Sequence, residues 1–492
     1  MAYDLVIKGG QLVTASETYV ADLAIRGERI AAIGAELRGR REIDATGLYL
    51  LPGAIDGHVH LTDPTYLPYA IPTADSFAVA SRAAAFGGVT TLIDFAQPAP
   101  GQSLLEGLER RQKDAAGQTV IDYSLHLNLR DPDPARLAEI PAIFARGVPS
   151  FKFFMAYEGY RLADVPLFRA MEAVAAQGGL AIVHAENFDL IQALRQRLAG
   201  EGKTGPRWHV AACPPVAEGE AVHRALALAH LAGARVLIYH VSCLEGVREL
   251  RLAKARGQAV FGEACVQYLT LTDAVYAVAE SPVRDESEAA ARRTTGSRRA
   301  QALMVSPPLR DAAHQAALWQ GLANGALDIV STDHNPRHPT GDRHPAGTAS
   351  IETRLALLHT FGVKTGRLSL NRWVEVCCTR PADLFGLAGK GRLTPGYDAD
   401  LALFDPTKEV TFSAKTLHSA IDFCTYEGLT VTGYPVMTIS RGEVIVEGGA
   451  FTGRPGRGRF VEREISHLRV RPAEKSSGLS RLADPHKRRS QI

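Results

Sequence analysis

Short apolar runs alternate with turns over the first 50 residues. The runs cover residues 5–8, 11–13, 22–25 and 29–33, and Gly9-Gly10 separates the first two. Apolar runs of this length bounded by glycine or charged residues are typical of β-strands. The pattern therefore predicts a small sheet in this segment.

The pattern changes between residues 53 and 388. Here β-like runs at residues 89–93, 121–125, 150–154, 180–183, 236–239 and 327–330 alternate with stretches rich in alanine and leucine. Strands that alternate with helices build parallel sheets of βα units. This segment therefore predicts the α/β class and a (β/α)8 TIM-like barrel.

Short strands return after residue 389, at residues 400–404, 435–439 and 443–447. We expect the N-terminal segment 1–52 and the C-terminal segment 389–465 to pair as a small β-sandwich domain beside the barrel domain of residues 53–388. Residues 466–492 mix charge, serine and proline without periodicity, which predicts a basic, mobile tail.

Composition narrows the class of protein. Of the 492 residues, 46% are hydrophobic and 22% charged, as in soluble globular enzymes. A formal net charge of +2 argues against nucleic acid or an anionic membrane as a partner. The first residues do not read as a signal peptide and no apolar run is long enough to span a membrane, so we expect a cytoplasmic protein. The six cysteines form no CxxC pair, which favours reduced thiols over a cysteine-bound metal.

Candidate metal ligands lie at the ends of predicted strands. His58 and His60 are two residues apart, so on a strand both imidazoles face the same side. Two packed histidines would satisfy this motif equally well. However, His184, His240 and Asp333 also follow β-like runs, and the carboxyl ends of barrel strands meet at one mouth. A shared metal site explains all five positions together.

Lys152 lies in the apolar run Phe151-Lys152-Phe153-Phe154. An ammonium there would cost several kcal/mol unless it is paired or neutralised. One interpretation is a lysine that reaches the edge of the barrel. The other is an amine carboxylated by carbon dioxide, whose carbamate bridges two cations.

Taken together, these motifs resemble the dihydropyrimidinase and D-hydantoinase family of the amidohydrolase superfamily. The resemblance covers nearly the whole chain, and its motifs include DGHVHL, AAAFGGVTTLIDF, SFKFFMAY, VHAEN, SPPLR and STDH. The late segment AKTLHSAIDFCTYEGLTVTGYPV separates this family from dihydroorotases and allantoinases, which share the metal motifs.

The resemblance implies two divalent metal ions, zinc in the usual case, with manganese or cobalt as alternatives that the same ligands accept. It assigns His58, His60 and Asp333 to the more buried ion and His184 and His240 to the more exposed one. Lys152 as N6-carboxylysine and a hydroxide would bridge the two ions. The implied assembly is a homotetramer or homodimer.

The resemblance also implies a hydrolase that opens hydantoins or dihydropyrimidines to N-carbamoyl amino acids by attack of the bridging hydroxide. Asp333 would take the proton from the hydroxide and pass it to the leaving ring nitrogen. Tyr157 would donate its hydroxyl to the developing oxyanion, and the backbone around Ser306 would bind the ring imide.

The chain departs from the family pattern near the predicted site. Asn335 and Arg337 stand where hydantoinases commonly have Cys and Phe, and Ala346-Gly347 stands where Asn-Gly is usual. An insert at residues 281–300 is rich in Arg and Glu. These departures put the identity of the ring in doubt, although the aromatic and apolar loop 66–71 favours an apolar substituent.

Two other functions remain open. An allantoinase-like enzyme would use the same metals on a more polar ring. A non-catalytic scaffold of the same fold is the other alternative. Such a scaffold would not need residues that can bind metal at all six ligand positions.

Overall fold

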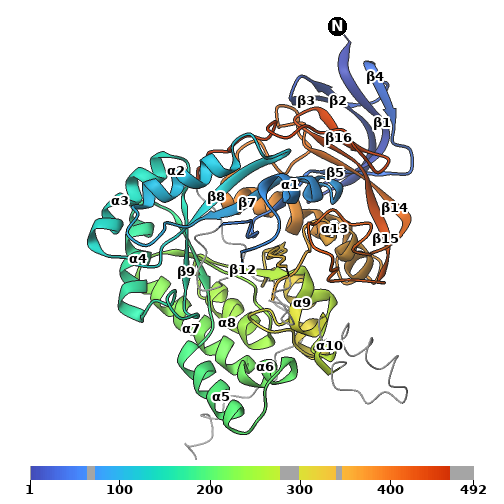
Figure 1. Ribbon diagram of the computed structural model, residues 1–492. Helices are drawn as coiled ribbons and strands as arrows, with labels where there is room; N and C mark the ends of the chain where they lie inside the picture. Colours follow the sequence, from blue (N-terminus) through green and yellow to red (C-terminus); the bar gives the residue numbers. More distant parts are fainter. Residues whose placement is uncertain (1, 64–71, 278–298, 339–345, 466–492) are drawn as a thin grey trace, which may run out of the picture.

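A parallel eight-stranded sheet forms the centre of the molecule (Figure 1). The computed structural model describes residues 2–63, 72–277, 299–338 and 346–465. The sheet order is β13-β12-β11-β10-β9-β8-β7-β6. Its strands are β6 (Ala54–Asp56), β7 (Val89–Ala96), β8 (Asp122–Asn128), β9 (Ser150–Phe154), β10 (Leu180–His184), β11 (Arg235–Ile238), β12 (Val260–Cys265) and β13 (Ile329–Ser331).

The first and last strands of this sheet approach each other at their carboxyl ends. Val59 and His334 form an isolated parallel bridge, and the His60 amide donates to the His334 carbonyl at 2.8 Å. Almost every residue of the eight strands is buried, because helices cover one face and barrel side chains fill the other. The predicted α/β fold class with a (β/α)8 TIM-like barrel is confirmed.

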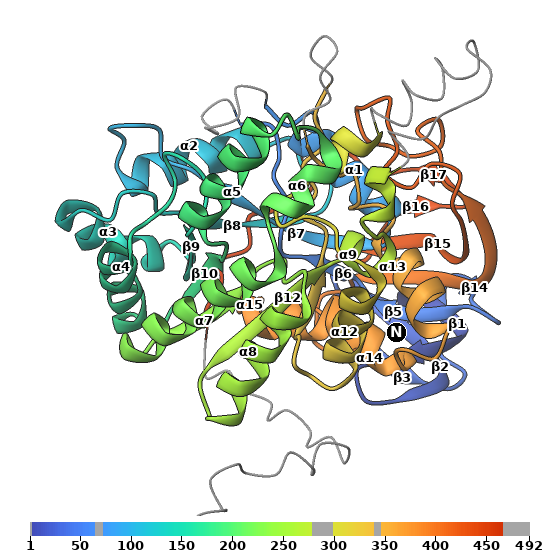
Figure 2. The same cartoon turned by 90° about the horizontal axis from the view of Figure 1, so that it is seen from below.

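Helices lie around the outside of the barrel (Figure 2). Several begin at polar caps: Ser103 and Glu106 form a capping box at α2, and Asp133 caps α3 ahead of Pro134. The helices are α1 (Phe77–Phe86), α2 (Leu104–Ala115), α3 (Pro134–Ala145), α4 (Asp164–Ala176), α5 (Phe188–Gly200), α6 (Pro206–Ala212), α7 (Pro215–Leu231), α8 (Leu244–Ala255), α9 (Val266–Thr270), α10 (Ala274–Ala277), α12 (Ala312–Ala323), α13 (Arg354–Leu358), η2 (His359–Val363), α14 (Leu370–Val374), η3 (Glu375–Thr379) and α15 (Arg380–Phe385).

A second, mixed sheet combines both ends of the chain. Its order is β17-β16-β15-β14-β5-β1-β2-β3, and β4 pairs with β1. The predicted pairing of the two flanking segments is therefore confirmed, through antiparallel β5 and β14. The strands are β1 (Tyr3–Val13), β2 (Thr18–Arg26), β3 (Arg29–Gly34), β4 (Gly39–Asp44), β5 (Tyr49–Pro52), β14 (Leu401–Thr411), β15 (Thr430–Ser440), β16 (Glu443–Glu447) and β17 (Ala450–Phe451).

A buried ion cluster joins the two sheets. The Lys390 Nζ lies 2.6 Å from Asp122 on β8, 2.9 Å from Asp398 and 2.6 Å from Asp400, which precedes β14. Burial opposes the charge of Lys390, but the three carboxylates raise its pKa. Arg441 also lies 3.1 Å from Asp122, and Arg29 lies 2.6 Å from Asp398, so several ion pairs connect the barrel to the mixed sheet.

The segment after β17 returns to the amino-terminal end of the barrel. The Val461 amide donates to the Tyr123 carbonyl at 2.7 Å, and Val461 and Ile465 pack against the apolar cluster inside the barrel. Arg463 is buried there, where its Nε donates to the Ser124 hydroxyl at 2.8 Å. The last described residues therefore close the end of the barrel opposite the strand carboxyl ends.

All six cysteines lie in the described part of the chain, and each is buried and free, as predicted. Among the described residues, no helix has both the length and the apolar character needed to cross a membrane. Loop 66–71, nearly all of the insert 281–300 and the tail 466–492 lie outside the described residues.

Candidate metal centre

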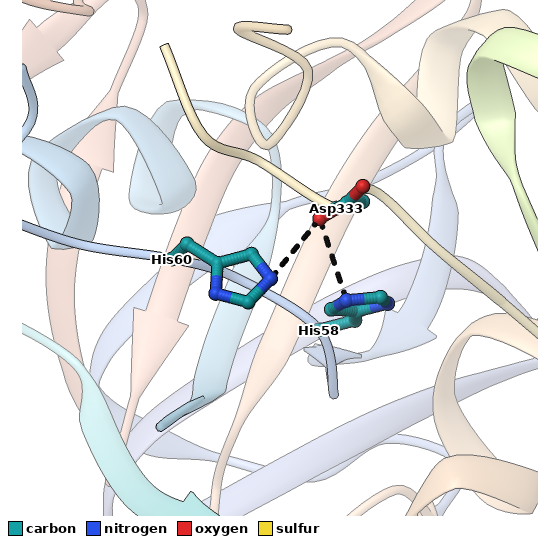
Figure 3. Close-up of side chains that lie close together, drawn as sticks. All are labelled: His58, His60 and Asp333. Carbon is teal, nitrogen blue, oxygen red and sulfur yellow. Dashed lines mark ion pairs between the residues drawn. The ribbon is translucent and has the colours of Figure 1, made fainter. Parts of the chain in front are cut away.

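Two histidines and one aspartate converge where the first and last barrel strands end (Figure 3). The Asp333 Oδ1 lies 3.3 Å from His58 Nε2 and 3.2 Å from His60 Nε2. Ligand atoms that are each about 2.1 Å from a tetrahedral zinc ion are roughly 3.4 Å apart. The donor set and its spacing therefore fit a divalent cation held by these three side chains.

The other predicted ligands lie beside this trio. His240 is close to His184, with ring centroids 4.4 Å apart, and to His58, with centroids 5.6 Å apart. All six predicted ligands line one cavity: His58, His60, Lys152, His184, His240 and Asp333. Five strands thus bring these six groups to one space, and their role as metal ligands stays a prediction.

Burial keeps the imidazoles of His58 and His240 in the neutral form, which is the form that binds metals. It lowers the pKa of His58 and of His240 well below the ordinary value, with further lowering from the Lys152 charge. Neutral rings carry the lone pair that a ligand needs. The short contact between His58 and Asp333 is therefore one of a neutral imidazole with a carboxylate, although its spacing would suit an ion pair.

Asp333 is ionised, whereas the imidazoles of His58 and His240 are neutral. Burial opposes its ionisation, but the electrostatic interaction with the adjacent His58 ring and the hydrogen bond with His60 lower its pKa to about 2. The carboxylate is therefore ionised at neutral pH. Asp333 supplies the negative charge that a cation in this position requires.

The Lys152 amine is fully buried, and aromatic rings surround it. Its Nζ lies 4.1 Å from the centre of the Tyr239 ring and 5.1 Å from that of Phe154. Among the described residues, no carboxylate lies within salt-bridge distance of it. Burial lowers its pKa to about 7, against the charges of Glu263 and Asp333, so a large share of the amine is neutral at pH 7. The interpretation of a lysine that reaches the barrel edge does not fit this position.

Two carboxylates that the sequence analysis did not single out orient the histidines. The Glu263 Oε2 lies 2.9 Å from His58 Nδ1 and accepts the His240 amide at 2.9 Å, while Glu186 Oε2 lies 2.8 Å from His184 Nε2. Carboxylates that hold the second ring nitrogen fix the orientation of metal-binding histidines. Glu263 could have been recognised in the sequence as an acidic residue inside the strand Val260–Cys265, which is buried throughout.

The backbone is strained at three of the predicted site residues. Tyr157, His240 and Asp333 have φ values of 71°, 40° and 47°. Side chains other than glycine rarely adopt positive φ, and such strain gathers at functional sites. Its presence in this cavity is a second, independent sign of function.

Tyr157 and Ser306 also line the cavity. The Tyr157 ring lies beside His184, with centroids 4.7 Å apart. Ser306 belongs to the segment between the insert and α12. Both are therefore within the same space as the six candidate ligands, and their roles stay predictions.

The remaining described wall of the cavity comes from four segments. Phe154 ends β9, and Met304 and Val305 precede Ser306. The other contributors are Asn335, Arg337, Ala346 and Gly347. A side chain at Gly347 would lie 2.2 Å from the Asn335 carbonyl oxygen, so this close approach requires glycine.

One other acidic cluster has the spacing of a metal site, but a lysine fills it. Asp122, Asp398 and Asp400 group around Lys390 in the ion cluster between the sheets. The ammonium already supplies the positive charge. Among the described residues, the cavity at the strand ends is therefore the candidate for metal chemistry.

Comparison with known proteins gives a consistent result. Residues 49–445 match the amidohydrolase family. A D-hydantoinase from Streptomyces coelicolor is 39% identical over 94% of this chain and 98% of its own length. The crystal structure of dihydropyrimidinase from Brevibacillus agri NCHU1002 has a TM-score of 0.86 at 38% identity, covering 94% of this chain and 99% of that one. The L-hydantoinase (dihydropyrimidinase) of Arthrobacter aurescens has a TM-score of 0.83 at 32% identity, covering 94% and 100%.

Proposed function

Because this chain belongs to the amidohydrolase family, and within it to the dihydropyrimidinases and D-hydantoinases, we propose that it opens hydantoin or dihydropyrimidine rings to N-carbamoyl amino acids. It is a hydrolase of cyclic amides. The observation that carries the proposal is the convergence of four histidines, an ionised aspartate and a lysine with a pKa lowered to about 7 on one cavity.

The donor set supports a centre of two divalent cations. His58, His60 and Asp333 would hold one ion, and His184 and His240 the other. Nitrogen and oxygen donors suit zinc, and manganese or cobalt would be accepted as well. When bound, the two cations would lower the pKa of a water molecule between them, which makes hydroxide available to attack an amide carbonyl at neutral pH.

Lys152 would join the two ions as N6-carboxylysine. A neutral amine is the form that adds carbon dioxide, and the lowered pKa of Lys152 supports its presence at neutral pH. The carbamate would replace a buried positive charge by a negative one. This removes the cost of an unpaired ammonium in an apolar strand.

Three side chains would act on the substrate. Asp333 is ionised, so it would accept the proton released on attack and deliver it to the leaving ring nitrogen. Tyr157 would donate a hydrogen bond from its hydroxyl to the developing oxyanion. The strained backbone at Tyr157 would hold this side chain in place. The backbone at Ser306 would bind the ring imide.

A comparison of substrates tests the proposal. Purified enzyme loaded with zinc is given 5-substituted hydantoins, dihydrouracil and allantoin, and formation of the ring-opened product is followed for each. We expect turnover of a hydantoin or dihydropyrimidine. Exclusive turnover of allantoin would favour the allantoinase-like alternative, and absence of bound metal after reconstitution would favour a scaffold.

A further inference from the structure

Arg463, at the closed end of the barrel, is a buried cation that the proposed ring-opening chemistry does not use. Burial lowers its pKa to about 9, so the guanidinium is still charged at neutral pH. Among the described residues, no carboxylate lies within ion-pair distance of it. Its N–H groups donate instead to neutral acceptors, which are the hydroxyls of Ser124 and Ser150 and the carbonyls of Leu125 and Phe385. A buried charge held by neutral groups calls for a chemical reason.

One of the two serine contacts leads toward the metal centre. The Arg463 Nη2 donates to Ser150 Oγ at 2.8 Å, and this oxygen lies 2.6 Å from His126 Nδ1. The His126 Nε2 lies 3.1 Å from the Gly57 carbonyl oxygen. Gly57 directly precedes the candidate ligand His58. Groups that are far apart in the sequence thus form a continuous chain, which ends at the peptide before a metal ligand.

The protons of this chain have one arrangement that satisfies every contact. Burial lowers the pKa of His126 well below its ordinary value, and the Arg463 charge lowers it further, so the ring is neutral and carries one N–H. The Tyr239 hydroxyl donates to the Gly57 carbonyl at 2.7 Å, which leaves no proton for His126 Nε2, 3.1 Å away. The ring N–H therefore lies on Nε2, and Nδ1 accepts the Ser150 hydroxyl. Every donor points from Arg463 toward Gly57, and the charge at the start strengthens each bond.

The Gly57 carbonyl also anchors a ring of the metal site. Because it accepts the Tyr239 hydroxyl, its direction fixes the position of the Tyr239 ring. This ring stacks on His58 with centroids 3.9 Å apart and an interplanar angle of 19°, and its centre lies 4.1 Å from Lys152 Nζ. A displaced Gly57 carbonyl would therefore disturb the surroundings of two candidate ligands.

We propose that Arg463 is a positioning residue for the metal centre and that it acts through Ser150 and His126. Its target is the Gly57 carbonyl, which orients the peptide before His58. This inference rests on the proposed function, because that function requires a metal ion at His58. The last described segment of the chain would thus set the geometry of a centre at the other end of the barrel.

Two buried serines provide a matched test. Both accept a hydrogen bond from Arg463 at 2.8 Å. Each hydroxyl also has a second partner, which is His126 for Ser150 and the Val461 carbonyl for Ser124. Replacement by alanine therefore removes two hydrogen bonds in either case, but only Ser150→Ala interrupts the chain. The readouts are the dissociation constant for zinc, measured against a competing chelator, and the absorption spectrum of the cobalt-loaded protein.

We expect Ser150→Ala to weaken zinc binding by roughly tenfold and to change the cobalt spectrum, since groups that support metal ligands alter affinity by about 10- to 100-fold. Ser124→Ala should keep the parental affinity and spectrum. Arg463→Gln should resemble Ser150→Ala, and the double variant should bind zinc no more weakly than either single one, because members of one chain are not additive. Thermal unfolding shows whether Arg463→Gln folds, and if it does not, the serine pair decides.

Metal binding separates this inference from the proposed reaction. Equal zinc affinities and identical cobalt spectra for the two serine variants would overturn the inference, and so would a folded Arg463→Gln protein with parental affinity. A parent that binds zinc but opens no hydantoin or dihydropyrimidine would refute the proposed reaction, while the serine pair would still decide on Arg463. A parent that binds no metal would refute both.

Discussion

Replacing Asp333 by Asn separates metal binding from proton transfer. Asn keeps the size of the side chain and an oxygen atom that can occupy the position of Oδ1, 3.2 Å from His60 Nε2 and 3.3 Å from His58 Nε2. It removes the negative charge and the ability to accept a proton. We therefore expect Asp333→Asn to retain at least one metal ion per chain.

The catalytic loss should be large. The Asp333 carboxyl has a pKa of about 2, so at pH 7 nearly every molecule carries the base that the variant lacks. Loss of general acid–base catalysis alone lowers rates by roughly 10²- to 10⁴-fold. This corresponds to about 3–5 kcal/mol in the activation barrier. Single-turnover ring opening, with metal content measured on the same sample, gives the value.

His334 is the neighbouring group that would otherwise carry the proton, and its contacts argue against it. Its Nε2 lies 3.0 Å from Asp75 Oδ2, and its Nδ1 accepts the Ser350 amide at 3.2 Å. Both ring nitrogens are therefore engaged in the described structure. The control Asp75→Asn disturbs this pair without removing a cavity residue, and should cost far less than Asp333→Asn. Near-parental turnover by a metal-replete Asp333→Asn enzyme would refute the assigned proton carrier.

Three further predictions concern the lysine bridge, the ion cluster and assembly. Lys152→Ala should lose metal and activity together, with partial rescue by short-chain carboxylic acids that occupy the bridge; a fully active, metal-replete variant would rule the bridge out. Lys390→Met should lower the free energy of unfolding by about 3–5 kcal/mol in urea, because the buried carboxylate of Asp400 would keep no ion-pair partner among the described residues. The exposed pair of Lys203 with Glu201 offers the control, since Lys203→Met should cost less than about 1 kcal/mol, and equal losses would contradict the reasoning. By family resemblance we predict a homotetramer, or failing that a homodimer, and light scattering that finds only monomer at micromolar concentration would exclude both.

Much of the fold could be predicted because barrel strands are buried on both faces and leave continuous apolar runs. β9 occupies Ser150–Phe154, as the pattern predicts. The sequence pattern did not predict β12, because Gly262 and Glu263 interrupt its apolar run. It did not predict β6 because this strand is only three residues long. Several barrel strands begin or end one to three residues away from the predicted positions. At these positions hydrogen bonding to neighbouring strands outweighs the local sequence.

The site was predictable to the extent that its residues are chemically unusual for their surroundings. A lysine in an apolar strand and an HxH motif are visible in the sequence. The pairing of His334 with Asp75 is not, because 259 residues separate them and only the closed barrel brings them together. The same holds for Glu263 beneath His58, where 205 residues separate the partners.

The closure of the barrel by Val461, Arg463 and Ile465 has a consequence for synthesis of the protein. The ribosome releases the eight barrel strands long before it makes the residues that fill the amino-terminal end of the barrel, and β5 must also wait for its partner strand β14. Contacts of such high sequence separation form slowly, so apolar barrel surface stays exposed while the chain is incomplete. The enzyme should therefore depend on chaperones during translation more than a protein whose terminal segments fold locally.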